Sequence, residues 1–446
     1  MSKFEFGFAK EDITPRRGLG LCGYFNLRPN RGFYDRLSVK AAAFRSGKTV
    51  CAVVSFDLCL FPLSFVRELE KRLAKDNSPL AGKVLFCATH THTGPFLTPL
   101  FGHPEAVDPD YMEDLKQKAV KAVEKAYAAL APAELWTCTT ECTTLAFNRR
   151  YVMKNGQTLT NPGKLNPDIV RPEGGIDPSI IIAEIRQDDR AVMLMTNISN
   201  HSDTVGGDIV SADWPGRMEK EIQNAFGYDI PVMTIIAPQG NINHFDVSTD
   251  ADQTSYEEAK RIGKGYANVI LAALYRLKKV EKTPLSCAVR DFEAPYLKLT
   301  DAEYKQAKKV YAENKDAVME EGKDFTSEDI ARGVPAVKKM FAQMAIECRE
   351  KAIKGKRIET QMAITFGKDL AIVSLPAEPF VEIGYAIREK SKYPKTMIAA
   401  LGMGEIGYVG LARHYGHGGY ETSPSRGKAS PEAAEAMIAG AIELLK

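Results

Sequence analysis

Short apolar runs alternate with amphipathic stretches along most of the chain. An unbroken apolar run bounded by turn residues is typical of a buried strand, whereas apolar residues that recur every three or four positions indicate a helix. The strands predicted in this way are Thr49–Phe56, Val84–Thr89, Ile180–Ile185, Ala191–Ile198, Val232–Ala237, Glu359–Phe366, Leu370–Leu375 and Thr396–Leu401. The predicted helices are Leu63–Lys75, Tyr111–Leu130, Met218–Phe226, Tyr256–Leu277 and a last helix that begins after Ser430.

Turn and cap residues support several of these boundaries. Asp108 and Pro109 precede one helix, and Ser430 and Pro431 precede another. A side chain that accepts a backbone hydrogen bond, followed by proline, is a typical helix start. Asp188-Asp189 separates two strands closely enough for an antiparallel hairpin. Because some strands are linked by helices and others by short turns, the pattern predicts an α/β fold with mixed sheets.

One stretch, roughly 300–356, is charged and has few strand signals. We interpret it as two helices that form a helical insertion, and we expect residues 1–446 to form a single domain. The sequence shows no internal repeat and no low-complexity linker. With 44% hydrophobic and 26% charged residues, the composition is that of a globular protein with a sizeable core, which excludes disorder and coiled coil.

Charge and cysteine usage narrow the expected partners and location. The 59 basic and 57 acidic side chains give a net charge of +2 without a long basic tract, so we expect no nucleic-acid partner. No apolar run approaches the roughly 18 residues of an integral membrane segment. The first residues contain no apolar signal core, and the eight cysteines are scattered in apolar surroundings. We therefore expect a cytoplasmic protein with reduced thiols.

Several predicted strands end in polar side chains. His90 and His92 directly follow one strand, His201 follows another, and Glu378 follows a third. Because ligands in α/β proteins bind beyond the carboxyl ends of strands, we expect these side chains to share one site. Two histidines and one carboxylate make a familiar open zinc site with water in the remaining position. Zinc would lower the pKa of that water toward ~7 and polarise a carbonyl group.

The number of histidines that bind the metal stays open at this point. In an extended segment His90 and His92 point to opposite faces, so one of them suffices as a ligand unless the chain turns. Gly94-Pro95 favours such a turn. A dinucleotide site fits less well, because no helical pattern follows the glycines of Gly402–Gly407. A serine nucleophile is not supported either, because the chain has no Gly-x-Ser-x-Gly elbow.

Seven segments resemble, in the same order, motifs of the neutral, non-lysosomal ceramidase family, zinc-dependent amidases that cleave the N-acyl bond of ceramide. These segments are Gly7–Pro15, Thr89–Pro95, Asn148-Arg149, Asn197–His201 with Asp213, Pro376–Glu378, Gly407–Val409 and Gly419–Glu421. The resemblance extends from about residue 7 to about residue 425. It implies a ceramidase-like catalytic domain built on mixed sheets, with helices packed on the sheets.

The resemblance also implies roles for individual residues. The residues that would hold zinc are His90, His201, Glu378 and Tyr408. The residues that would bind or polarise the substrate are His92, Arg149 and Tyr420. A donor such as His92 or Tyr420 can stabilise the oxyanion that forms when an amide carbon is attacked.

The segment Gly240–His244 departs from the family pattern. The family has Gly-Asp-x-Ser-Pro at this point, whereas this chain has Asn241 and Asn243 in place of the acid and the hydroxyl. Asn241 can hold a water molecule but cannot take its proton, so we expect another residue to act as the general base. His244 is the first candidate because imidazole titrates near neutrality, and Asp246 and Asp203 are the others.

The sequence therefore predicts a zinc-dependent hydrolase, foremost an amidohydrolase, with an ester, lactone or glycosidic bond as other targets. We expect neither a signal segment nor the family's C-terminal β-sandwich domain, and this expectation favours a small soluble substrate over a membrane lipid. Two alternatives remain. One is a true ceramidase that acts on N-acyl sphingosine, and the other is a non-catalytic, metal-containing binding protein without the family's Asp and Ser.

Overall fold

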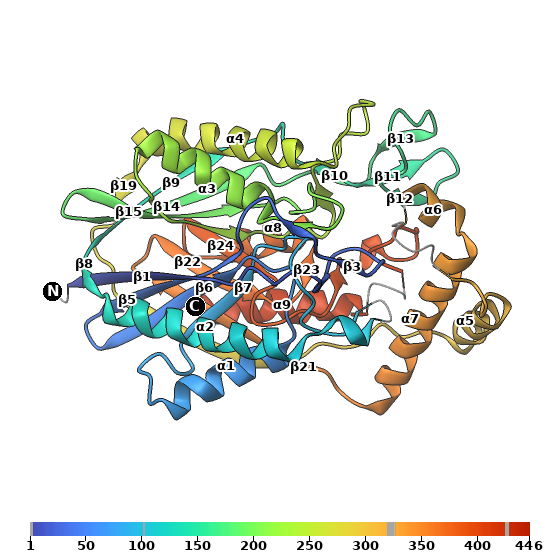
Figure 1. Ribbon diagram of the computed structural model, residues 1–446, viewed down its shortest axis with the longest axis horizontal. Helices are drawn as coiled ribbons and strands as arrows, with labels where there is room; N and C mark the ends of the chain where they lie inside the picture. Colours follow the sequence, from blue (N-terminus) through green and yellow to red (C-terminus); the bar gives the residue numbers. More distant parts are fainter. Residues whose placement is uncertain (1–2, 101–102, 319–324, 326, 424–427) are drawn as a thin grey trace.

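The computed structural model describes residues 3–100, 103–318, 325, 327–423 and 428–446 (Figure 1). As the sequence predicts, the fold is mixed α/β, with helices packed on mixed sheets. The described part of the chain holds three large sheets, and all three are built by the same order of connections.

The first sheet has the strand order β7-β6-β5-β1-β8. In chain order its elements are β1 (Phe4–Asp12), β5 (Ser38–Ser46), β6 (Thr49–Phe56), α1 (Leu63–Lys75), β7 (Val84–Ala88), α2 (Pro109–Ala128) and the short edge strand β8 (Ala131–Pro132). β1, β5 and β6 pair antiparallel. The crossover through α1 then makes β7 parallel to β6. Helix α2 packs on β1 and β5.

The other two sheets repeat this plan. The second contains β9 (Glu134–Glu141), β14 (Ser179–Gln187), β15 (Arg190–Ile198), α3 (Asp213–Phe226), β17 (Val232–Ile236), α4 (Tyr256–Ala273) and the edge strand β19 (Lys278–Lys279). The third contains β20 (Leu285–Glu293), β21 (Ile358–Phe366), β22 (Leu370–Leu375), α8 (Val381–Lys390), β24 (Lys395–Ala400) and α9 (Pro431–Leu444). In each, three antiparallel strands are followed by a helical crossover and one parallel strand.

The three parallel strands β7, β17 and β24 contact one another at the centre of the molecule. Their neighbours β6, β15 and β22 run in the same direction, because each is parallel to its crossover strand. The loops that follow these six strands therefore meet at the centre. This arrangement brings together side chains that lie far apart in the sequence.

A long connection links the first and second strands of each unit. The connection of the first unit holds β2 (Gly20–Leu21), β3 (Arg28–Pro29) and β4 (Gly32–Phe33). That of the second holds β10 (Phe147–Asn148), β11 (Arg150–Met153), β12 (Thr158–Thr160) and β13 (Ile169–Pro172). That of the third holds α5 (Asp301–Glu313), α6 (Ser327–Arg332) and α7 (Pro335–Lys354). The second and third connections lie at the end of the molecule opposite the N-terminus, on the right in Figure 1, and β3 of the first lies between them and the centre.

The third connection is the helical insertion predicted at about 300–356, but its described part contains three helices instead of two. Gly333 has a left-handed φ of +60° and Pro335 begins α7, so the chain stops one helix and starts another within three residues. The assignment of residues 1–446 to a single domain stays a prediction.

Cap and turn residues in the sequence predicted other helix and strand boundaries correctly. Asp108 accepts a hydrogen bond from the backbone N–H of Tyr111 at 2.7 Å and so caps α2. Asp188 and Asp189 both have left-handed φ values, +48° and +60°, as a two-residue hairpin turn requires. Ser430 stands at the N-cap position of α9 and Pro431 is its first residue.

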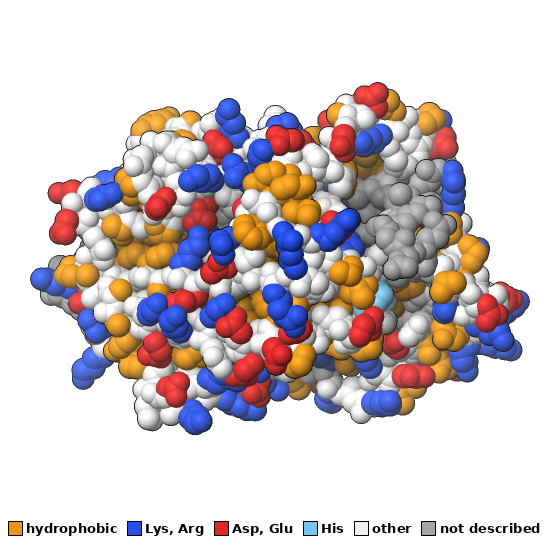
Figure 2. Space-filling view, in the orientation of Figure 1, with side chains coloured by type: hydrophobic (Ala, Val, Ile, Leu, Met, Phe, Trp, Pro, Cys, Tyr) orange, Lys and Arg blue, Asp and Glu red, His pale blue; other side chains and the backbone are white. Residues whose placement is uncertain are grey.

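The cysteines and the surface charges agree with the expectations from the composition. All eight cysteines are free, as expected. Within the described ranges, none of the helices has the length and apolar character that crossing a bilayer demands. Basic and acidic side chains are intermixed over the face shown in Figure 2, in keeping with the net charge of +2.

Candidate metal centre

Three side chains from the three sheets converge at the centre of the molecule. His90 follows β7, His201 follows β15, and Glu378 begins the short strand β23 (Glu378–Pro379) just after β22. The carboxylate oxygen Oε2 of Glu378 lies 3.1 Å from His90 Nε2 and 3.2 Å from His201 Nε2. All three side chains are almost fully buried. The strand ends thus bring together the histidines and the carboxylate singled out in the sequence.

Hydrogen bonds to the backbone orient both imidazole rings. His90 Nδ1 donates to the carbonyl oxygen of Cys59 at 2.7 Å. His201 Nδ1 faces the carbonyl oxygens of Gln239 and Ile242 at 3.0 and 2.8 Å. A carbonyl only accepts hydrogen bonds, so the proton of each ring is on Nδ1 and the Nε2 lone pair is turned toward Glu378. This is the orientation that metal-binding histidines have in proteins.

The converging atoms fit a metal cation. Two imidazole nitrogens and one carboxylate oxygen face one another with lone pairs, an arrangement that repels unless a positive charge lies between them. Among the described residues, no hydrogen-bond donor satisfies the buried Oε2 of Glu378. Two nitrogens and one carboxylate oxygen are also a typical ligand set of a catalytic zinc ion, which keeps a further position open.

The electrostatics of the cluster keep most of these groups in their metal-binding forms. Burial alone would raise the pKa of Glu378, but His90 and His201 outweigh it and hold that pKa well below its usual value. Burial, together with Arg149, lowers the pKa of His201. For His90, burial lowers the pKa but Glu378 outweighs it, so the net shift is upward. Of the two histidines that face Glu378, His90 is therefore the one that holds a proton more readily than usual.

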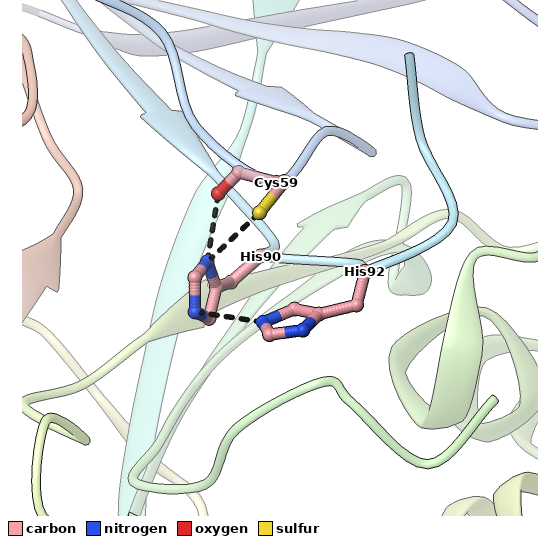
Figure 3. A group of neighbouring side chains, drawn as sticks. All are labelled: Cys59, His90 and His92. Atoms are coloured by element: carbon pink, nitrogen blue, oxygen red, sulfur yellow. Dashed lines mark hydrogen bonds between the residues drawn. The ribbon is translucent and has the colours of Figure 1, made fainter. Parts of the chain in front are cut away.

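A backbone turn brings His92 to the same place. His90 has a left-handed φ of +66°, so the segment is not extended and the two rings lie on one side, with centroids 4.7 Å apart. His92 Nε2 lies 3.2 Å from His90 Nε2 (Figure 3). Burial and the neighbouring His90 hold the pKa of His92 well below its usual value, so the ring stays neutral.

Cys59, His90 and His92 also lie close together, but they make a poorer metal site (Figure 3). The Cys59 thiol lies on the Nδ1 side of the His90 ring, 3.8 Å away, and His92 lies on the Nε2 side. One ion cannot bind both edges of one ring. A hydrogen bond with Cys22, together with burial, raises the pKa of the Cys59 thiol and disfavours the thiolate that a metal requires.

Tyr408 lies beside the cluster. It begins β25 (Tyr408–Val409), which pairs in parallel with β23 so that Tyr408 stands opposite Glu378. Its ring stacks on His201, with centroids 6.4 Å apart. The guanidinium group of Arg149 lies 5.1 Å from the centre of the Tyr408 ring. The position suits a fourth ligand, and that role stays a prediction.

Arg149 makes three further contacts. Its Nη2 donates to the carbonyl oxygen of Gly240 at 2.7 Å, and its Nε lies 2.8 Å from the carboxylate of Glu421. Its Nη1 lies 3.4 Å from His201 Nε2. Only 5% of Arg149 is exposed. Burial of a cation costs less free energy when a nearby carboxylate neutralises its charge. The guanidinium is thus held in place next to His201 and the other converging side chains.

These groups line a cavity of about 540 Å³. The ends of the strands form its floor, and the three long connections form its walls. The first connection supplies Tyr24 and Phe25, the second Arg149 and Lys164, and the third Phe325 and Ile330. His92 and Tyr420, both predicted to act on the substrate, line it as well. Sequence reasoning missed the aromatic wall residues, because isolated aromatic residues in loops have no spacing that marks them.

The two other predicted catalytic residues, His244 and Asn241, are not among the cavity-lining residues that the structure describes. His244 Nδ1 contacts the Asp203 carboxylate at 3.0 Å, and its Nε2 donates to the carbonyl oxygen of Gln253 at 2.6 Å. Asn241 accepts from the backbone N–H of Val381 and donates to Glu382. Both side chains are fully engaged by the protein, which leaves no nitrogen of His244 available to take a proton from water.

Comparison with known proteins agrees with the fold. No protein-family model and no curated protein matches the sequence. Among solved structures, a ceramidase complexed with C2 superposes with a TM-score of 0.74 at 15% identity, covering 100% of this chain and 75% of that chain. Neutral ceramidase from Pseudomonas aeruginosa superposes with a TM-score of 0.72 at 16% identity, covering 100% and 74%. At this identity the likeness shows a ceramidase-like fold.

Proposed function

We propose that this protein is a zinc-dependent hydrolase that cleaves the amide bond of a small N-acyl compound. His90, His201 and Glu378 would hold the metal, with Tyr408 as the fourth ligand. The ceramidase-like fold supports the assignment to hydrolases. The observation that carries the proposal is the buried Glu378 Oε2, which faces two histidine nitrogens and has no hydrogen-bond donor among the described residues.

The residues around the cluster suit acyl transfer to water. When bound, zinc supplies a Lewis acid that polarises a carbonyl group and lowers the pKa of water. His92 lines the cavity next to the ligands and can donate a hydrogen bond to the oxygen on which negative charge develops. Arg149 keeps a fixed positive charge beside the same position, because Glu421 and Gly240 hold its guanidinium. Tyr420 lines the cavity and can orient the substrate.

The shape of the cavity favours a small substrate. Its volume of about 540 Å³ lies within the range of roughly 300–1,000 Å³ that is usual for small-molecule sites. The ring of Phe25 packs against Phe341 of α7 and against Tyr420, with centroids 6.0 and 6.1 Å apart. Phe25 and Tyr420 line the cavity, so this aromatic cluster forms part of its wall and narrows the room for a long acyl chain there.

The test is hydrolysis by purified protein, assayed with and without zinc. We expect one zinc per chain and turnover of short-chain N-acyl amines, with a chelator abolishing both and added zinc restoring both. We expect little release of fatty acid from long-chain ceramide in micelles. Efficient ceramide turnover would instead identify a true ceramidase. A protein that contains no metal even after incubation with zinc would refute the proposal.

The alternative of a non-catalytic binding protein has one observation in its favour. Asn241 and Asn243 stand where the ceramidases have an acid and a hydroxyl, and both side chains are tied up in contacts with other residues. A zinc-loaded protein that binds N-acyl amines in calorimetry but hydrolyses none of them, nor related esters, lactones and glycosides, would favour this alternative.

A further inference from the structure

Asp203 presents a carboxylate to the cavity that the proposed chemistry does not use. It follows the ligand His201 by two residues and lines the cavity with His90 and His92. One oxygen, Oδ1, contacts His244 Nδ1 at 3.0 Å. The other, Oδ2, has no hydrogen-bond donor that the structure places among the described residues, and the side chain keeps 12% exposure.

The surroundings hold this carboxylate in a single orientation. His244 Nε2 faces the carbonyl oxygen of Gln253, which can only accept, so that nitrogen has a proton. A second proton must lie between Nδ1 and Oδ1, because two lone pairs at this distance would repel. Gln253 is itself fixed, since its side chain bonds to the backbone N–H and carbonyl group of Asp246. His244 therefore donates a hydrogen bond to Asp203, and its bond to Gln253 holds the ring in place.

The cavity has other polar lining residues and aromatic ones. Thr160, Asn161 and Thr254 line it in addition to Asp203. Phe245, another lining residue, packs its ring on His244 with centroids 4.2 Å apart. The Tyr24 hydroxyl lies 3.5 Å from the backbone carbonyl oxygen of Asp203. A buried acceptor with polar neighbours selects ligands that donate hydrogen bonds, because a ligand without a donor leaves the acceptor unpaired.

We propose that Asp203 binds a hydrogen-bond-donating group of the substrate, a hydroxyl or an ammonium, and that His244 positions Asp203 for this contact. The inference rests on the proposed hydrolase function and adds a specificity-determining residue to it, which polar groups on the amine part of an N-acyl compound can test. It gives His244 a positioning role in place of the general base expected from the sequence.

The experiment compares three N-acyl compounds of matched length whose amine part ends in a hydroxyl, an ammonium or a methyl group. The acyl group is the one that the wild-type protein hydrolyses best. We expect a KM at least about tenfold lower for the hydroxyl or the ammonium compound than for the methyl compound. Whichever of the two is preferred identifies the donor.

Asp203→Asn should remove this preference, raise the KM of the preferred compound at least about tenfold and change kcat less than about threefold. Zinc content should stay at the wild-type value. Asp208→Asn is the matched control, because Asp208 forms a surface ion pair with Arg31 and does not line the cavity. His244→Gln, which keeps a donor for Asp203, should retain the preference better than His244→Ala.

An Asp203→Asn variant that keeps the wild-type ratio of KM values would overturn the inference, as would loss of zinc in that variant. If the wild-type protein hydrolyses none of the compounds, the proposed function fails but the inference can still be tested. Calorimetry with ethanolamine, ethylenediamine and propylamine then decides it, and equal binding of all three to wild-type protein and Asp203→Asn would refute it.

Discussion

The backbone conformation of one residue determines what the His90-x-His92 pair can do. With extended geometry the two side chains would point to opposite faces, and His92 would leave the cavity. The left-handed φ of +66° at His90 turns both rings to one side. Such a conformation costs a non-glycine residue about 1–2 kcal/mol. The hydrogen bond from the His90 N–H to the carbonyl oxygen of Leu58 and the bond from His90 Nδ1 to Cys59 offset this cost.

The two histidines should therefore have different roles. His90 should bind the metal, and His92 should donate a hydrogen bond to the substrate. We expect His201→Ala to lose zinc and activity together, because it removes a ligand. We expect His92→Ala to keep zinc and to lower kcat by about 100-fold, the usual effect of removing one oxyanion donor. Elemental analysis and steady-state kinetics on the same samples separate the two results. Equal loss of zinc in both variants would make His92 a ligand.

At the scale of elements, a residue that departs from the family pattern has a structural use here. Helix α8 begins just after the proposed ligand Glu378, and its N-cap residue, Phe380, has no side chain that can accept a hydrogen bond. Asn241, from the loop after β17, accepts from the N–H of Val381 instead and donates to Glu382. The amide thus ties the second unit to the start of α8 in the third. An aspartate could accept the same bond but could not donate to Glu382.

Strand β21 carries a buried carboxylate that should make stability depend on pH. Burial raises the pKa of Glu359 to about 7, with Arg357 opposing the shift and Glu405 adding to it, whereas the ordinary value is 4.5. Between these values the folded protein holds a proton that the unfolded chain has lost. The free energy of unfolding must therefore fall as pH rises through this window, by up to about 3 kcal/mol.

Urea unfolding between about pH 5 and about pH 8 should show this slope, and Glu359→Gln should flatten it because the amide has no proton to lose. Glu293→Gln is the control, since Glu293 is an exposed residue of the neighbouring strand β20 and pairs with Lys356. An unchanged slope in Glu359→Gln would assign the pH dependence to another group.

At the scale of the whole molecule, the limits of sequence reasoning have a physical cause. The strand Thr49–Phe56 and the helix Leu63–Lys75 were predicted with the bounds that the structure has, because periodicity is a local property. The convergence of His90, His201 and Glu378 was predicted because ligands in α/β proteins bind beyond the carboxyl ends of strands. The threefold repetition of the sheet plan could not be detected in the sequence. Many different apolar residues fit the interior of a sheet, so units with the same connections can have unrelated sequences. The contacts of His244 and Asn241 were also hidden, because their partners, Gln253 and Val381, are set by tertiary packing.

The three units meet at the proposed metal, and this predicts how its removal should act. The first unit contributes His90, the second His201 and the third Glu378, so a bound ion would link the three sheets at the ends of β7, β15 and β22. Because the unfolded chain lacks this geometry, binding at about 100 times the dissociation constant adds about 2.7 kcal/mol to the free energy of unfolding.

For 446 residues, the usual entropy of unfolding converts this energy into a shift of about 3 °C in Tm. Calorimetry should therefore show a Tm about 3 °C lower after chelation, fully restored by zinc. Glu378→Gln, which keeps the size of the ligand but not its charge, should start near the lower Tm and respond to neither treatment. If elemental analysis shows that chelation removed the zinc while the wild-type Tm stays constant, the ion does not link the units, and the sheets hold together through their apolar contacts alone.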